Sequence, residues 1–429
     1  LDVDGGTIKL DGNYPVGTQN VALGEDTFTA IESGANYNTA LGYRALEALT
    51  TGDQNTAVGR QALADVTTGS DNTAVGFNAA DSTTTGSYNV SVGRDALQAN
   101  TTASYNTAVG RESLYFNTTG AENSAFGSGS LVRNTTGSYN TGLGRYALAL
   151  NTTASNNTAV GYQALYDNTT GTQNVAVGGN ALDSNTTASG NTAVGYDAAS
   201  AITTGVYNTC IGIDAGKAIT TADSNTMVGR FSGVNTTGTA NTFIGKNCGY
   251  TVTTGSKNTI LGQYNGNQNG LDIRTSSNNV VLSDGDGNPR LYIDSSGRNL
   301  IGQTAASSPA GGAIFQVTQS NNNWMSFLRN SASSGAVYGL SIVFGGQAPN
   351  NTTSAFMAGG DTGAERFRIY SNGNIVNQNN SYGAISDVKL KENIVDASSQ
   401  WDDIKALTVR KYSMKADALD APNMLGVIA

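Results

Sequence analysis

The sequence contains no histidine, and only two of its 429 residues are cysteine. The lack of histidine removes the Ser-His and Cys-His nucleophile pairs and the usual zinc ligand. Cys210 and Cys248 lie two copies apart in a repeated sequence and at different places within it, which exceeds the reach of a disulfide. We therefore expect both to be small apolar fillers, and we predict no metal site and no cofactor.

Charged and aromatic residues are also scarce, at 13% and 7% of the chain, whereas 54 residues are glycine. The formal net charge of −9 has the wrong sign for nucleic acid or an anionic membrane surface, and we expect neither as a partner. No apolar run approaches the roughly 18 residues of a membrane span, so we expect no membrane insertion. This composition cannot fill one large core, but it suits thin stacked coils.

A short repeat organises most of the chain. Its motif NTAVG occurs unaltered at 55–59, 72–76, 106–110, 157–161 and 191–195, with variants on either side. The leading asparagine returns at every seventeenth position, as from Asn55 to Asn72, with one step longer by one and one step shorter by one. Such a strict period is typical of a solenoid. The leading asparagines are Asn20, Asn38, Asn55, Asn72, Asn89, Asn106, Asn123, Asn140, Asn157, Asn174, Asn191, Asn208, Asn225, Asn241 and Asn258.

The motif predicts a short strand in each copy. The fourth residue is always Val, Leu, Ile or Phe, as at Val109, so we expect it to point into the core of its own coil. The third residue is nearly always small, as at Ala108, and by alternation it would point outward. Because an outward apolar face some ten coils long is rarely left in water, we expect the third residues to pack against another copy of the chain.

The rest of the copy predicts turns and ladders. Glycine closes the strand, and an A-L pair such as Ala147 and Leu148 returns the chain as one helical turn or a second strand. The N-T-T segments fit the glycosylation pattern, but they recur because the turn recurs. Stacked asparagines are expected to hydrogen-bond from coil to coil. Tyrosines before the asparagine, such as Tyr105, are expected to stack along the rod, with a sugar-binding face as the alternative.

Five segments follow from these patterns: a lead-in at 1–19, a β-solenoid at 20–262, a β linker at 263–302, a distal β domain at 303–385 and a charged segment at 386–429. In the linker, DGDGN at 284–288 has the spacing of a calcium loop, but Pro289 stands where such a loop needs glycine and Ser295 where it needs glutamate. This segment therefore predicts a hairpin turn. Most large aromatics gather in 303–375 among short alternating runs, which predicts an antiparallel sheet.

The segment SDVKLKENI, 386–394, resembles the start of the intramolecular chaperone domain that ends phage tail fibres, tailspikes and endosialidases. This resemblance implies trimer assembly followed by cleavage between Ser386 and Asp387, with Ser386 and Lys391 as the catalytic pair. A lysine partly buried at an interface can lose its proton near neutral pH and activate a serine hydroxyl. Because Ser386 cannot easily reach its own carbonyl carbon, the attack would come from a neighbouring chain or from water. The structural alternative is a charged helix start capped by Asp387.

Two further similarities support this interpretation. The segment RLYIDSSGRNLIG, 290–302, resembles the strand-turn-strand linker of phage tail fibres, and the NTAVG coils are similar to the head repeats of trimeric autotransporter adhesins. From Asp387 to Ala429, 13 of 43 residues are charged, and stretches such as SQWDDIKAL are compatible with helices. We expect the chaperone to be incomplete at Ala429 and the chain, which begins at Leu1, to be a fragment or processed product.

The sequence therefore predicts an all-β, trimeric β-solenoid of about 15 coils, followed by a small β domain and the start of a helical chaperone. The resemblance implies a bacteriophage tail fibre, made in the host cytoplasm and present in the extracellular virion. Its expected partners are its own copies, other tail proteins and a host receptor, either a glycan or an outer-surface protein. Self-cleavage is the only expected enzymatic step.

Two other functions stay open. A bacterial surface adhesin or filament would explain the coils but not the segment at 386–394. A glycan-degrading tailspike would need paired carboxylates in a groove, and no acidic pair recurs in the repeat.

Overall fold

The computed structural model describes residues 2–3, 6–7, 17 and 19–301, together with the strands 315–317, 355–360, 365–370, 375–377, 409–412 and 424–427. Every element among these residues is a β-strand, and none is a helix. The chain divides into two units, 1–325 and 326–429, which are described separately. The helix-compatible stretch at 399–407 lies outside the described residues.

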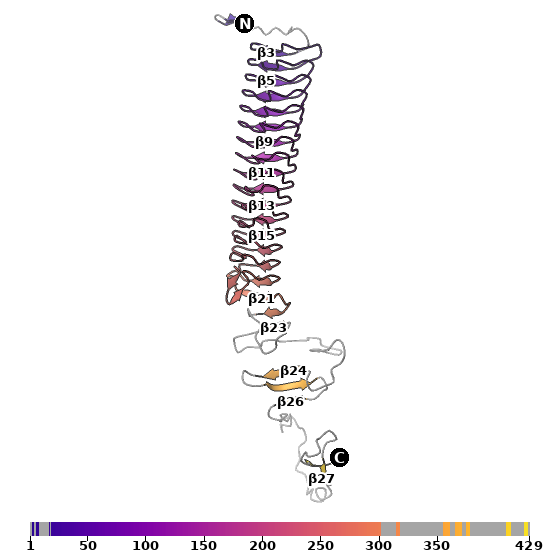
Figure 1. Ribbon diagram of the computed structural model, residues 1–429, viewed down its shortest axis with the longest axis vertical. Coiled ribbons are helices and arrows are strands. Elements are labelled where there is room, and N and C mark those ends of the chain that lie inside the picture. The colour runs from indigo at the N-terminus through magenta and orange to yellow at the C-terminus, as the bar shows by residue number, and fades with distance from the viewer. Residues whose placement is uncertain are drawn as a thin grey trace, which may run out of the picture. The chain divides into compact units, whose positions relative to one another are not determined.

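The first unit is a parallel β-solenoid in which each coil contributes one three-residue strand (Figure 1). Neighbouring strands pair in register and one repeat apart in the regular coils, so that Thr141, Gly142 and Leu143 lie beside Thr158, Ala159 and Val160. At about 4.8 Å per strand, fifteen strands make a rod of roughly 70 Å. The predicted solenoid of about 15 coils with a 17-residue repeat is confirmed. Its strands are β3 (Val21–Leu23), β4 (Thr39–Leu41), β5 (Thr56–Val58), β6 (Thr73–Val75), β7 (Val90–Val92), β8 (Thr107–Val109), β9 (Ser124–Phe126), β10 (Thr141–Leu143), β11 (Thr158–Val160), β12 (Val175–Val177), β13 (Thr192–Val194), β14 (Thr209–Ile211), β15 (Thr226–Val228), β16 (Thr242–Ile244) and β17 (Thr259–Leu261).

The sheet extends beyond the predicted boundary at residue 262. A last coil, four residues longer than the regular 17-residue repeat, brings β20 (Val280–Ser283) alongside β17 in parallel. The expected hairpin forms next, since β20 pairs antiparallel with β21 (Pro289–Ile293), which pairs antiparallel with β22 (Asn299–Ile301). β23 (Phe315–Val317) then adds in parallel to β22. The other pairs in this unit are antiparallel, namely β1 (Asp2–Val3) with β2 (Gly6–Thr7) and β18 (Asn267–Gln268) with β19 (Leu271–Asp272).

The second unit contains antiparallel strands. β24 (Ala355–Gly360), β25 (Glu365–Tyr370) and β26 (Ile375–Asn377) form a three-stranded sheet within the segment predicted as a distal β domain. β27 (Val409–Tyr412) pairs with β28 (Met424–Val427) in the charged C-terminal segment.

Positions in a coil are numbered here from its leading asparagine, so that Asn55 is position 1 and Asp71 is position 17. The return limb is neither the helical turn nor the second strand that the A-L pair predicts. It is a series of tight turns with left-handed residues at positions 7, 9 and 17, as at Gln61, Leu63 and Asp71, whose φ angles are 57°, 51° and 58°. Gly59 at position 5 has φ 134°, and a Cβ there would lie 2.3 Å from the carbonyl oxygen of Gly76. Only glycine fits this close stacking.

The predicted orientation of the strand residues was wrong. Position 3 points into the core, where Ala57 and Ala159 are fully buried, whereas position 4 points outward, where Leu41 remains 42% exposed. The cause is the leucine at position 9, which fills the interior from the return limb. A Cβ on Gly142 at position 3 would lie 2.5 Å from Oγ of Ser130 and 3.4 Å from Cγ of Leu131. The space beneath each strand therefore admits little more than a methyl group in most coils.

Asparagine ladders hold the coils together, as the sequence predicts. At position 1, the backbone N–H of Asn157 donates to Oδ1 of Asn140 at 3.1 Å, and Nδ2 of Asn157 donates to the carbonyl oxygen of Gly171 at 2.9 Å. The same pattern continues to Asn279, whose N–H donates to Oδ1 of Asn258 at 2.9 Å. Because these side chains are buried, each hydrogen bond also satisfies a polar group that water cannot reach.

A second ladder lies at position 12, where Nδ2 of each asparagine from Asn117 to Asn185 donates to Oδ1 of the asparagine one coil earlier. At its start, Nδ2 of Asn100 donates to Oγ1 of Thr83. The bond from Asn151 to Asn134 measures 2.8 Å, as does the bond from Asn185 to Asn168. The ladder ends at Asn185, whose Oδ1 is buried without a hydrogen-bond partner, because the next position 12 is Ile202. These fully buried N-T-T asparagines cannot carry a glycan in the folded chain. The ladder consists of Asn100, Asn117, Asn134, Asn151, Asn168 and Asn185.

Candidate interaction surface

The outward face of the parallel sheet consists of positions 2 and 4, which is called the strand face below. Position 4 of β3–β17 is Leu23, Leu41, Val58, Val75, Val92, Val109, Phe126, Leu143, Val160, Val177, Val194, Ile211, Val228, Ile244 and Leu261. Position 2 is Val21, Thr39, Thr56, Thr73, Val90, Thr107, Ser124, Thr141, Thr158, Val175, Thr192, Thr209, Thr226, Thr242 and Thr259. All thirty positions are uncharged, and none of their side chains is buried.

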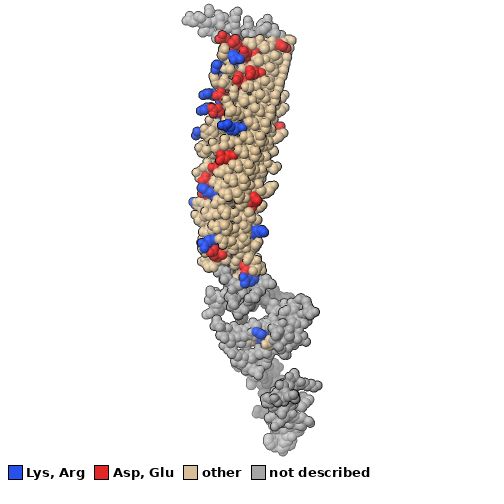
Figure 2. Space-filling model, in the orientation of Figure 1, with Lys and Arg blue, Asp and Glu red and all other residues tan. Residues whose placement is uncertain are grey.

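The strand face is long and continuous. Fifteen strands give roughly 70 Å, and three residues give about 10 Å of width, so the face covers on the order of 700 Å². In Figure 2 the Lys, Arg, Asp and Glu side chains of the rod gather toward one side of the visible surface and leave a broad uncharged area beside them. Position 4 gives this face a continuous apolar row, and a single chain rarely exposes such a row unless a partner covers it.

Aromatic rings and arginines alternate in four successive coils at position 6, just beyond the end of the strand, as Tyr43, Arg60, Phe77 and Arg94. The guanidinium carbon of Arg60 lies 5.9 Å from the ring centroid of Tyr43 and 5.1 Å from that of Phe77. Arg94 continues the row at 5.9 Å from Phe77. These cation–π contacts link neighbouring coils. Because position 6 lies beyond the strand, the arginines are beside the strand face rather than on it.

The exposed tyrosines that precede the leading asparagine occur in scattered coils, and only one pair of them lies in neighbouring coils. Tyr88 and Tyr105, in neighbouring coils, stack with centroids 4.9 Å apart and planes 4° apart, which confirms the predicted stacking for this pair. Because position 17 is left-handed, the rings project from a turn rather than from the strand.

Both cysteines behave as predicted. Cys210 and Cys248 are free and buried, and burial raises the pKa of each thiol to about 12. Neither thiol is a reactive nucleophile at neutral pH.

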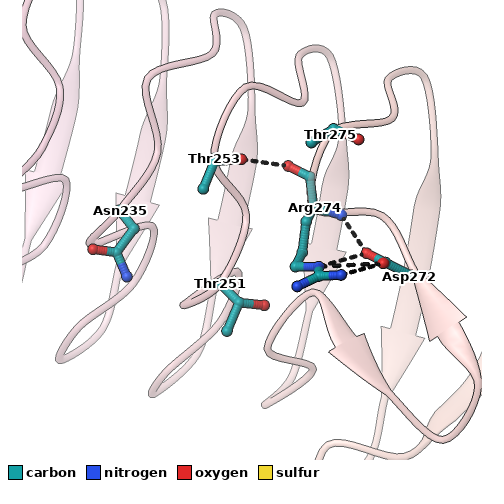
Figure 3. A pocket seen from close by; sticks show the side chains of 6 residues that line it. All are labelled: Asn235, Thr251, Thr253, Asp272, Arg274 and Thr275. Atoms are coloured by element: carbon teal, nitrogen blue, oxygen red, sulfur yellow. Dashed lines mark hydrogen bonds and ion pairs between the residues drawn. The ribbon is translucent and has the colours of Figure 1, made fainter.

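A pocket of about 340 Å³ lies at the far end of the solenoid, where the coil length changes (Figure 3). Its walls come from the coil that is one residue shorter than the regular repeat, from the next coil, and from the coil that is four residues longer than the regular repeat. The guanidinium of Arg274 pairs with the carboxylate of Asp272, with Nη2 2.7 Å from Oδ2, and Arg274 lowers the pKa of this carboxyl. The pocket is lined by Asn235, Thr251, Thr253, Asp272, Arg274 and Thr275.

The residues that line this pocket are polar and balanced in charge, although most of the surface that they present to it is apolar. The hydroxyl of Thr253 donates to the carbonyl oxygen of Arg274 at 3.3 Å. The side-chain Nδ2 of Asn235 donates to the carbonyl oxygen of Tyr250 at 2.8 Å. Amide, hydroxyl and paired ionic groups can bind the hydroxyls of a small ligand. The pocket contains one carboxylate, so it lacks the pair that glycoside hydrolysis requires.

Acidic side chains of neighbouring coils lie close enough to influence one another electrostatically, which the repeat did not reveal. Asp183 is half-buried, and burial, together with the charges of Asp197 and Asp167, raises the pKa of its carboxyl. The pKa of Asp81 is raised in the same way by burial and by Asp65. The partners occupy different positions in neighbouring coils, so their spacing in the sequence does not match the period of the repeat. None of these carboxylates lines the pocket described above.

Lys217 binds two of the acidic side chains. Its Nζ lies 2.8 Å from Asp197 and 2.7 Å from Asp214, and these hydrogen bonds raise the pKa of the ammonium group.

Two further sequence predictions concern the loop 284–288 and the proposed cleavage site at 386–391. In the loop 284–288, the carboxylate of Asp284 accepts hydrogen bonds from the backbone N–H groups of Asp286 and Asn288, as expected for a hairpin turn. The described part of the chain shows no group of three metal-ligating side chains. The predicted catalytic pair Ser386 and Lys391, and the cleavage partner Asp387, lie outside the described residues.

No protein-family model, curated protein or solved structure matches the chain. Among the described residues, no helix has the length and apolar character needed to cross a membrane.

Proposed function

We propose that the chain is a structural and host-attachment fibre of a bacteriophage tail, assembled as a homotrimer through the strand face. By the resemblance at 386–394, its C-terminal segment is an assembly chaperone that cleaves itself off after Ser386. The single observation that carries the self-association is the uncharged strand face, which extends along fifteen coils.

Another copy of the chain is the partner that fits this face best. The face presents the same pair of positions every 4.8 Å or so, and the chain itself has a surface with this period. Its area, on the order of 700 Å², approaches the roughly 800 Å² that each partner buries in a stable interface. Because no charge lies on the face, its burial requires no desolvation of an ion.

A homotrimeric rod suits attachment because it presents each receptor-binding group three times, and weak contacts then gain avidity. The pocket beside Arg274 supports this role, since its amide, hydroxyl and ionic groups can bind a hydroxyl-bearing receptor such as a glycan. The attachment role therefore combines a rigid spacer with repeated polar sites.

The test is the oligomeric state of the full chain, measured by light scattering after size exclusion. We expect three copies for the unmodified chain and for Thr170→Lys, which adds a charge at an exposed turn. Val160→Lys on β11 should yield monomers that keep the β-sheet signal in circular dichroism, because position 4 points away from the core of its own coil. A monomeric unmodified chain, or trimers of Val160→Lys as stable as those of Thr170→Lys, would refute the proposed assembly.

A further inference from the structure

The strand face changes shape at one strand. Among β3–β17, position 4 carries an aromatic residue only at Phe126, and position 2 carries serine only at Ser124. Both substitutions fall on β9, so the bulkiest and the smallest outward side chains share one coil. The ring of Phe126 is 42% exposed, although Val109 and Leu143 lie beside it on β8 and β10.

The other variations on this face are small. Leucine and isoleucine at position 4 exceed valine by one methylene, and the valines at position 2 are close to threonine in shape. Ser124 lacks the methyl group that threonine has at this position, whereas Phe126 adds a whole ring relative to valine. A complementary surface must therefore provide space for Phe126 at one level of the rod and nowhere else.

In the proposed trimer, a neighbouring copy of the chain provides that space. The strands run across the rod, so a threefold axis parallel to the rod arranges the three strands of one level head to tail around a triangle. Position 4 at the end of one strand then meets position 2 at the start of the next copy's strand. In register, Phe126 of each copy meets Ser124 of its neighbour.

We propose that Ser124 and Phe126, called the β9 pair, fix the axial register of the three copies. This inference rests on the proposed assembly through the strand face. If one copy slips by one coil, Phe126 meets the bulkier Thr107 or Thr141, while Ser124 faces Val109 or Leu143 and leaves a gap. All other levels of the regular region present nearly the same surface after a slip, so they discriminate weakly between registers.

Engineered cysteines on differently tagged, co-expressed full chains can report the register. Val194→Cys on one copy should form a disulfide with Thr192→Cys on its neighbour when the copies are in register. It should bond with Val175→Cys or Thr209→Cys only after a slip of one coil. The native Cys210 and Cys248 are buried and do not compete.

In the otherwise unmodified chain we expect the in-register disulfide to exceed either slipped one at least about tenfold. The double variant Ser124→Thr with Phe126→Val should remain trimeric, but its preference should fall below about threefold because every level is then alike. Leu41→Val, which trims the same face on β4, five strands away from the β9 pair, should keep the full preference. Adding Thr158→Ser with Val160→Phe to the double variant should restore it, because the pair is then rebuilt on β11.

The outcomes separate the two proposals. Trimers of the double variant that keep the full in-register preference would overturn the role of the β9 pair and leave the assembly proposal standing. If the chain with an unaltered β9 pair stays monomeric and forms no disulfide between copies, both the assembly proposal and the role of the β9 pair would be overturned.

Discussion

Phe243 and Gly249 face each other across the core of the solenoid, such that a Cβ on Gly249 would lie 2.4 Å from Cδ2 of Phe243. Phe243 occupies position 3, where most coils have alanine, and Gly249 occupies position 9, where most have leucine. The same exchange joins Met227 to Gly233. In these two coils the core therefore keeps much of its volume, because the bulky side chain moves from one limb to the other.

This exchange predicts a rescue. Phe243→Ala should leave a cavity and cost about 3–5 kcal/mol, and Gly249→Leu should overpack the core and cost about 1–3 kcal/mol. Together they recreate the alanine and leucine of a regular coil, and leucine accepts the left-handed backbone at position 9, as Leu182 does with φ 53°. The double variant should lie within about 1 kcal/mol of the parent chain in urea unfolding. Additive losses in the double variant would show that the two positions do not share a space.

The same exchange explains what the sequence could and could not predict. The repeat length, the strand in each copy, the asparagine ladders and the hairpin after β20 all follow from spacing and residue type. The orientation of the strand did not, because alternation in a three-residue strand fits either face, and the larger Val109 was assigned to the core instead of Ala108. The inverse relation in size between the residues at positions 3 and 9 would have shown, from sequence alone, that position 3 faces the core. The electrostatic interactions among Asp183, Asp167 and Asp197 depend on the path of the return limb. That path is hard to predict from sequence because its leucines adopt a left-handed backbone that leucine rarely takes.

The end of the position 12 ladder predicts unequal effects for one substitution at two sites. Asn151→Ile would leave Oδ1 of Asn134 without a donor and remove an acceptor from Asn168, so two buried polar groups would lose partners. Asn185→Ile would only transfer the existing unsatisfied oxygen to Asn168. Because an unsatisfied buried group costs about 1–3 kcal/mol, the internal substitution should cost at least about 2 kcal/mol more.

Calorimetric melting of both variants at one protein concentration measures this difference. Isoleucine itself is acceptable at this position, since Ile202 and Ile219 occupy it in later coils. Equal melting temperatures would mean that the ladder bonds add nothing beyond packing.

Asp183 predicts a dependence of stability on pH. Because its carboxyl has a raised pKa in the folded chain, the folded state holds this proton more tightly than the unfolded state does. The contribution of Asp183 is therefore fully favourable below the ordinary value of 3.8 and is lost as pH rises through the folded pKa. Asp183→Asn should raise the melting temperature at pH 7, and the gain should disappear toward pH 3. Glu122→Gln, at an exposed position, serves as the matched control and should show no such gain.

The segment at 386–394 predicts self-cleavage that depends on two named side chains. If Lys391 deprotonates the hydroxyl of Ser386, then Ser386→Ala and Lys391→Ala should both abolish cleavage, while Lys389→Ala, two residues away, should leave it intact. Intact mass spectrometry of the expressed chain decides this, because cleavage yields a product that ends at Ser386. Cleavage should also require assembly, so Val160→Lys should reduce it if the attacking group comes from a neighbouring chain. An uncut product in the unmodified chain, or a cut that survives Ser386→Ala, would exclude the proposed chemistry without affecting the solenoid.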